Sequence, residues 1–125
     1  MPPSRWIHLT VACALMLPAC GSEPGSRPRG DLGVALDALC EARMLSARRR
    51  ISEAEATFTD RAHAFLHELA READRASAAG LLEAKARVEQ AFGMEPAEPA
   101  ALARLLEALR RRTAEAAEVQ VPSCS

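Results

Sequence analysis

Two histidines four residues apart are the side chains of this sequence best suited to binding a metal ion. His63 and His67 lie in the run DRAHAFLHELA, which begins at Asp60, and Asp74 follows seven residues after His67. On a helix, this spacing places two imidazoles one turn apart on the same face. Two imidazoles with a carboxylate are acceptable ligands for copper, zinc or iron. The pattern therefore predicts a candidate transition-metal site made of His63, His67, Asp60 and Asp74.

The apolar face of the same helix points away from this candidate site. With Phe58 as the reference and about 100° per residue, the apolar Phe65 and Leu69 fall within roughly 40° of it. The two histidines and the two aspartates fall between about 140° and 200°, nearly opposite. Such an exposed pair binds metal weakly unless another helix or chain adds ligands. A solvated polar stripe is the simpler interpretation, and metal binding is the alternative.

The sequence holds no group of residues typical of catalysis. It has no glycine-rich phosphate loop, no serine-nucleophile context and no Glu-x-x-His motif for a di-iron site. We therefore expect a non-catalytic protein, with no cofactor other than the candidate metal ion. The formal net charge of −1 gives no indication of binding to nucleic acid.

The first twenty residues, MPPSRWIHLTVACALMLPAC, have the order of an export signal. A short polar start with Arg5 precedes an apolar run, which ends in small residues before Cys20. The end of this segment, Leu17-Pro18-Ala19-Cys20, resembles the lipobox of a bacterial lipoprotein. The resemblance implies that a peptidase cleaves after Ala19, that the Cys20 sulfur receives a diacylglyceryl group and that the new N-terminus is acylated.

A lipid on Cys20 would hold the mature protein at a membrane. One acyl chain gives marginal membrane binding, whereas two or three hold firmly. The alternative is a single transmembrane anchor, but the apolar run is shorter than the roughly 20 residues that a span needs. We expect a lipid-anchored protein of the bacterial cell envelope that faces the extracytoplasmic space, at the cell membrane or at the outer membrane.

Two further cysteines would remain in the mature chain, Cys40 and Cys124. An even number of cysteines in an oxidising compartment favours a disulfide. The bridge would tie the middle of the first helix to the C-terminal tail and stabilise a small domain. Two free thiols are the alternative.

Apolar residues recur at three- and four-residue steps in the rest of the chain, the period of a helix. They predict helices over 32–49, 53–77, 81–92 and 100–118. In the first of these, the spacing puts Leu36, Leu39 and Met44 on the inward face. The basic run Arg48–Arg50 would close that helix as a solvated end, with contact to anionic lipid as the alternative.

Local signals set the expected helix ends. Ser52 and Glu55 form a capping box that opens the second helix, although one unbroken helix over 32–77 is the alternative. Gly80 lies near the next break, and Gly93 stands where a C-terminal cap belongs. Pro99 suits the first position of the last helix.

These elements predict an all-α protein with a three- or four-helix up-and-down bundle. The expected organisation is a signal peptide over 1–19, a lipidated cysteine and flexible tether over 20–31, and a helical domain over 32–125. With no catalytic group, we expect an interaction or scaffold module whose protein partner the sequence does not reveal. The alternative is an accessory protein that binds copper, zinc or iron weakly through His63 and His67.

Overall fold

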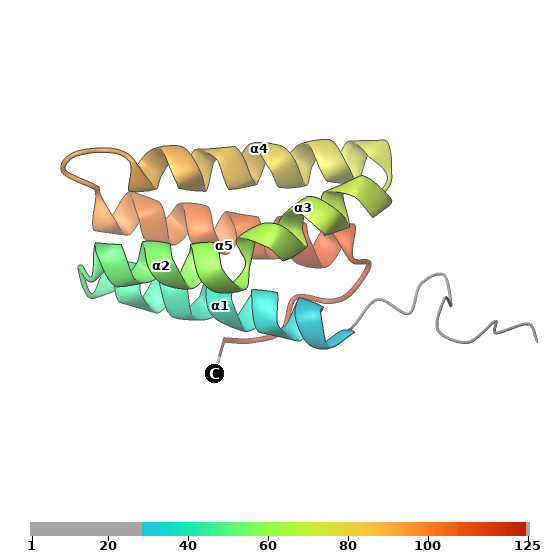
Figure 1. Ribbon diagram of the computed structural model, residues 1–125, viewed down its shortest axis with the longest axis horizontal. Coiled ribbons are helices and arrows are strands. Elements are labelled where there is room, and N and C mark those ends of the chain that lie inside the picture. Colours follow the sequence, from blue (N-terminus) through green and yellow to red (C-terminus); the bar gives the residue numbers. More distant parts are fainter. Residues whose placement is uncertain (1–28, 125) are drawn as a thin grey trace, which may run out of the picture.

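The computed structural model describes residues 29–124, and side chains from Asp31 onward. This part of the chain forms five helices and no strand, which confirms the all-α class (Figure 1). The helices are α1 (Arg29–Ala47), α2 (Ile51–Arg61), α3 (His63–Glu72), α4 (Arg75–Phe92) and α5 (Pro99–Ala116). None of them is long and apolar enough to cross a membrane. The expected signal peptide and Cys20 lie outside the described residues.

The helices run up and down, and α5 packs against both α1 and α4 (Figure 1). Helices α2 and α3 follow one another with a bend between them: α2 lies along α1, and α3 crosses over to α4. This packing fits a helical bundle in which α2 and α3 together take the place of one long helix. Leucines from α1, α3, α4 and α5 fill most of the interior, and α2 contributes Phe58. The ring centroids of Phe58 and Phe92 are 5.9 Å apart.

Helix α1 differs from the prediction at both ends. It begins at Arg29 instead of residue 32, so the expected tether over 20–31 is helical at its end. It ends at Ala47, and the amides of Arg49 and Arg50 donate hydrogen bonds to carbonyls of its last turn. Met44, expected in the core, is 43 % exposed.

The predicted capping box is wrong. Helix α2 begins at Ile51, one residue before Ser52, and no side chain caps it. Arg49 adopts a left-handed conformation, with φ 63°, and this sharp turn starts the next helix within three residues. Ser52 therefore lies inside the first turn, where it cannot act as the cap, and Glu55 of the predicted box is exposed. Arg50, the residue before α2, pairs with Glu53.

The predicted helix over 53–77 is broken twice. At Ala62, with φ −121° and ψ −39°, the chain bends between α2 and α3 while the hydrogen bonds on either side are kept. The chain then leaves the helix at Ala73, which is extended. Asp74 caps α4 by accepting a hydrogen bond from the Ser77 amide.

Gly80 was predicted to lie near a break between helices, but it lies inside α4. The Asp74 cap starts that helix six residues earlier than expected. A Cβ on Gly80 would meet the Arg112 side chain of α5 at 3.6–3.7 Å, which is ordinary contact. The end of α4 at Phe92 and Pro99 in the first turn of α5 agree with the prediction. Gly93 is the capping residue, but its φ of −78° is right-handed.

Candidate functional site

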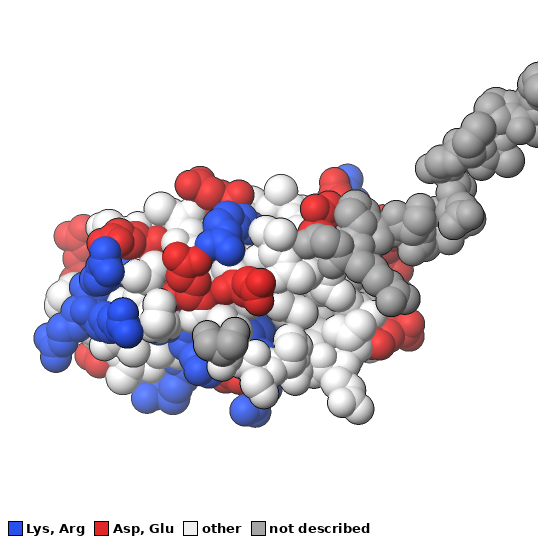
Figure 2. Space-filling model, turned by 90° about the horizontal axis from the view of Figure 1, so that it is seen from below, with Lys and Arg blue, Asp and Glu red and all other residues white. Residues whose placement is uncertain are grey.

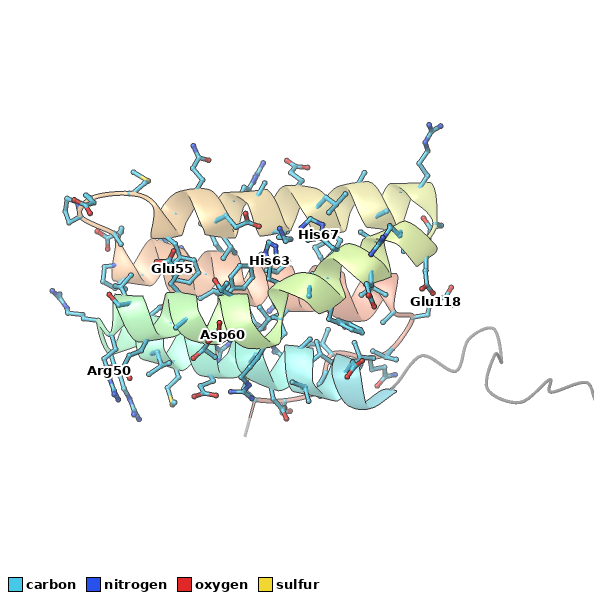
Figure 3. All side chains as sticks on the ribbon, in the orientation of Figure 1. Arg50, Glu55, Asp60, His63, His67 and Glu118 are labelled. Carbon is cyan, nitrogen blue, oxygen red and sulfur yellow. A yellow bond between two sulfur atoms is a disulfide. The ribbon has the colours of Figure 1, made fainter. Side chains whose placement is uncertain are left out.

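The two histidines lie together in the seam between α3 and α4, as Figure 3 shows. The His63 side chain is 38 % exposed; its ring stands edge-on to Phe58 and lies 4.8 Å from the ring of His67. Nδ1 of His63 is 3.7 Å from a carboxylate oxygen of Glu89 on α4. The predicted position opposite the core is therefore wrong for His63, because the bend at Ala62 brings α3 against α4.

A lysine occupies the centre of this seam. Lys85 is 6 % exposed at its side chain and forms an ion pair with Glu89. Its positive charge lowers the pKa of His67, and desolvation and the neighbouring His63 lower it further. The lowered pKa favours the neutral form of His67, which is the form of an imidazole that binds metals. A fixed ammonium group beside the same carboxylate nevertheless opposes the entry of a second cation.

The two predicted aspartate ligands are not part of this cluster. Both carboxylate oxygens of Asp74 accept hydrogen bonds from Ser77, from its amide and its hydroxyl, at 2.9 Å. These bonds hold the pKa of Asp74 below its ordinary value. Asp60 lines a hollow between α1 and the α2–α3 arm, with Asp31 and Phe65. Within residues 31–124, no three His, Cys, Asp or Glu side chains are grouped to hold a metal ion.

The predicted disulfide is present. Cys40 of α1 and Cys124 of the C-terminal tail are bonded, with their Cα atoms 5.6 Å apart. The bridge holds the tail against α1, although Val119 and Val121 of that tail remain exposed. The tail therefore depends on a small number of contacts for its position.

Glu107 of α5 connects three parts of the structure. Arg110 donates two hydrogen bonds to its carboxylate, at 2.8 and 2.9 Å, and Arg43 of α1 donates a third at 2.8 Å. The buried Arg110 guanidinium also donates to the carbonyl of Pro122 in the tail. The bonds from Arg110 are the main cause of the lowered pKa of Glu107. No local sequence pattern points to this group, because Arg43 lies 64 residues from Glu107 along the chain.

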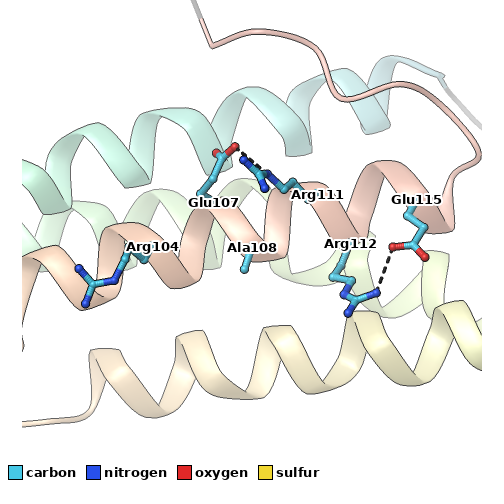
Figure 4. Close-up of a pocket in the computed structure, with 6 residues that line it drawn as sticks. All are labelled: Arg104, Glu107, Ala108, Arg111, Arg112 and Glu115. Carbon is cyan, nitrogen blue, oxygen red and sulfur yellow. Dashed lines mark hydrogen bonds and ion pairs between the residues drawn. The ribbon is translucent and has the colours of Figure 1, made fainter.

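The surface of α5 beside Glu107 has a shallow hollow of about 450 Å³, shown in Figure 4. Ala108 lies at its centre, with Arg104 and Arg112 pointing toward α4 and Arg111 toward α1. Glu107 and Glu115 complete the lining.

Charges of both signs cover the face that carries α1 (Figure 2). Basic side chains gather at the end of the bundle where the turn between α1 and α2 lies. Arg48, Arg49 and Arg50 are exposed there, in agreement with a solvated helix end. Arg50 pairs with Glu53, and Glu55 is exposed on the next turn of α2. The turn is thus flanked by acidic groups.

Comparisons of the chain with protein-family models, with curated proteins and with solved structures found no match.

Proposed function

We propose that this chain is a lipid-anchored lipoprotein of the bacterial cell envelope, whose helical bundle is a non-catalytic interaction module. The observation that carries the proposal is the pairing of Cys40 with Cys124. Disulfides persist in oxidising compartments and are rare in the bacterial cytosol. The pairing therefore supports an extracytoplasmic location for the bundle.

The pairing also supports a distinct role for Cys20. With Cys40 and Cys124 joined, Cys20 is the one cysteine after the expected cleavage point that is left for another use. It stands at the end of the lipobox-like Leu17-Pro18-Ala19-Cys20. A thioether-linked lipid there would hold the bundle at the membrane, and the residues up to Arg29 would serve as its connection.

The side-chain arrangement supports interaction in preference to chemistry. Leucines and two phenylalanines fill the core, and the described hollows are shallow and lie at the surface, with charged side chains in their linings. The histidine seam, which holds the most chemically versatile side chains, contains a buried lysine already paired with Glu89.

A second candidate is weak binding of copper, zinc or iron by His63 and His67. It is favoured by one observation: the imidazole rings of His63 and His67 lie 4.8 Å apart on α3. Lys85 works against it. Calorimetric titration of the full chain with copper(II), zinc(II) and iron(III), with His63→Ala/His67→Ala as the control, tests this candidate. Micromolar binding that the control loses would support it, and unchanged binding in the control would reject it.

The main proposal is tested by expressing the full chain in a bacterium with a labelled fatty acid. We expect label on the wild-type protein and on Cys13→Ala, which removes a cysteine of the expected signal, but none on Cys20→Ala. Under non-reducing conditions, Cys40 and Cys124 should resist alkylation. Labelling of Cys20→Ala, or two alkylatable thiols in the native protein, would contradict the proposal.

A further inference from the structure

The outer face of α5 carries more positive charge than its sequence indicates. Along α5, Glu107 is positioned to neutralise Arg111 one turn later. In the structure, Arg110 and Arg43 already donate three hydrogen bonds of 2.8–2.9 Å to that carboxylate. Arg111 is left with a long contact of 3.4 Å, and its side chain is 71 % exposed. Glu107 therefore leaves most of the Arg111 charge facing solvent.

Arg104 adds a second available guanidinium. It is exposed and has no ion-pair partner among the residues that the structure describes. Arg112 is different, because it pairs with Glu115 at 3.1 Å and lies over Gly80 of α4. The available charges of the hollow are thus Arg104 and Arg111, on the two sides of Ala108 (Figure 4).

The spacing of these two arginines fits a helical ligand. Their backbone positions are seven residues apart, which is two helical turns or about 10.5 Å along the same side of α5, and the two long side chains lean toward different neighbouring helices in Figure 4. A second helix that carries carboxylates with the same spacing could meet both guanidiniums, as charged positions do between paired helices. The small side chain of Ala108, halfway between them, lets the backbone of such a helix come close. Arginine is also enriched in protein–protein interfaces, where its planar group binds carboxylates through two hydrogen bonds.

We propose that the Arg104–Ala108–Arg111 face of α5 is a docking surface for an acidic helix of a partner protein. The inference rests on the proposed interaction function, since it names the surface and the kind of partner. Charge complementarity commits the surface to glutamate or aspartate side chains in helical register.

The test uses the full chain, purified from whole-cell extracts in a neutral detergent whether or not it carries a lipid, and a labelled alanine-rich helical peptide with glutamates seven residues apart. A second peptide has the same composition with the glutamates out of register. Fluorescence anisotropy at low salt measures binding of each peptide. We expect the first peptide to bind more tightly, and added salt to weaken its binding.

The critical variant is Arg104→Ala/Arg111→Ala, and the matched control is Arg71→Ala/Arg75→Ala, which removes the same charge from an exposed site on α3 and α4. We expect the critical variant to bind about tenfold more weakly, and the control to bind as the wild type does. Arg104→Ala alone, which removes a side chain without a described ion pair, should retain the native circular dichroism spectrum and show part of the loss.

Three outcomes would overturn the proposal: no binding of the in-register peptide, equal binding of the two peptides, or equal losses in the critical and control variants. Anionic phospholipid vesicles and inorganic phosphate are tested with the same variants. Dependence of either one on Arg104 and Arg111, without peptide binding, would assign the surface to a membrane or a free anion and reject the protein partner. Because the assay does not depend on the lipid, a missing lipid on Cys20 would refute the anchor and leave this result standing.

Discussion

Replacing Gly80 by alanine should stabilise the protein. Gly80 lies inside α4, six residues after the Asp74 cap, and glycine in a helix interior is about 0.5–1 kcal/mol less favourable than alanine. The new Cβ would lie 3.6 Å from Nη1 of Arg112 and 3.7 Å from its Cδ and Cζ. These are ordinary contacts with a flexible side chain, so no steric penalty opposes the gain. We expect the free energy of unfolding to rise by about 0.7 kcal/mol.

The matched control for this prediction is Gly33→Ala. Gly33 is an exposed residue of α1, and a Cβ added there would meet no atom within 4 Å. Urea unfolding followed by far-ultraviolet circular dichroism measures both variants. A gain in both, of similar size, is the expected result. If Gly33→Ala stabilises and Gly80→Ala destabilises, then α4 is not continuous through Gly80 or Arg112 cannot adjust, and the reasoning fails.

Three other perturbations test the contacts between elements. Replacing Cys40 and Cys124 by alanine should lower the free energy of unfolding by about 3 kcal/mol; this is less than the roughly 4.6 kcal/mol of loop entropy, because the tail is exposed and frays once released. A loss below about 1 kcal/mol in urea would contradict it. Glu107→Gln should lower the free energy of unfolding by about 2 kcal/mol, since a buried Arg110 loses its anionic partner. Because the pKa of Glu107 is lowered in the folded protein, its contribution to stability is present above the unfolded pKa and is lost as the pH falls through the folded pKa. A cost that does not change with pH would contradict the ion pair. The pKa of His67, measured by NMR titration, should lie below 6.5 and should rise in Lys85→Met. The contribution of neutral His67 to stability is then complete above pH 6.5 and is lost as the pH falls below that value. An unchanged titration midpoint of His67 in Lys85→Met would contradict the role of Lys85.

Local patterns predicted the all-α class and several helix ends. Apolar residues at helical spacing located most of the core, and the end of α4 at Phe92 followed from Gly93. Pro99 marked the first turn of α5, and the count of cysteines predicted the bridge between Cys40 and Cys124. Each of these signals depends on few neighbours in sequence or on pairing alone, so one sequence is enough to interpret it.

The bend at Ala62 could not be predicted in this way. No proline or glycine stands near it, and the amide of Ala62 and that of Leu66 keep their helical hydrogen bonds. The change of direction lets α2 stay on α1 while α3 packs on α4, which is a requirement of tertiary packing. A helical wheel drawn through Ala62 assumes one axis, and it therefore placed His63 on the wrong side of the helix.

Asp74 shows a second reason for error, because one residue type serves several purposes. An aspartate on the histidine stripe can ligate a metal, and an aspartate three residues before Ser77 can cap a helix. The sequence also suggests Ser52 and Glu55 as a capping box, but the turn at Arg49 starts α2 at Ile51 and leaves Ser52 inside the first turn. The structure uses Asp74 as the cap of α4, which moves the start of that helix and removes Asp74 from the candidate site.

The charge of the α5 face follows from the same dependence on distant residues. Within α5 alone, Glu107 stands one turn from both Arg110 and Arg111, and a count along the helix treats these charges as largely cancelled. Arg43 of α1, which the packing of the bundle places beside Glu107, forms an ion pair with the same carboxylate. Because one carboxylate cannot neutralise three guanidiniums, the most exposed of them, Arg111, is the one left to meet an external anion. The binding character of this surface is therefore set by a contact between α1 and α5, and a substitution at Arg43 should return Glu107 to Arg111 and weaken peptide binding without touching the docking face.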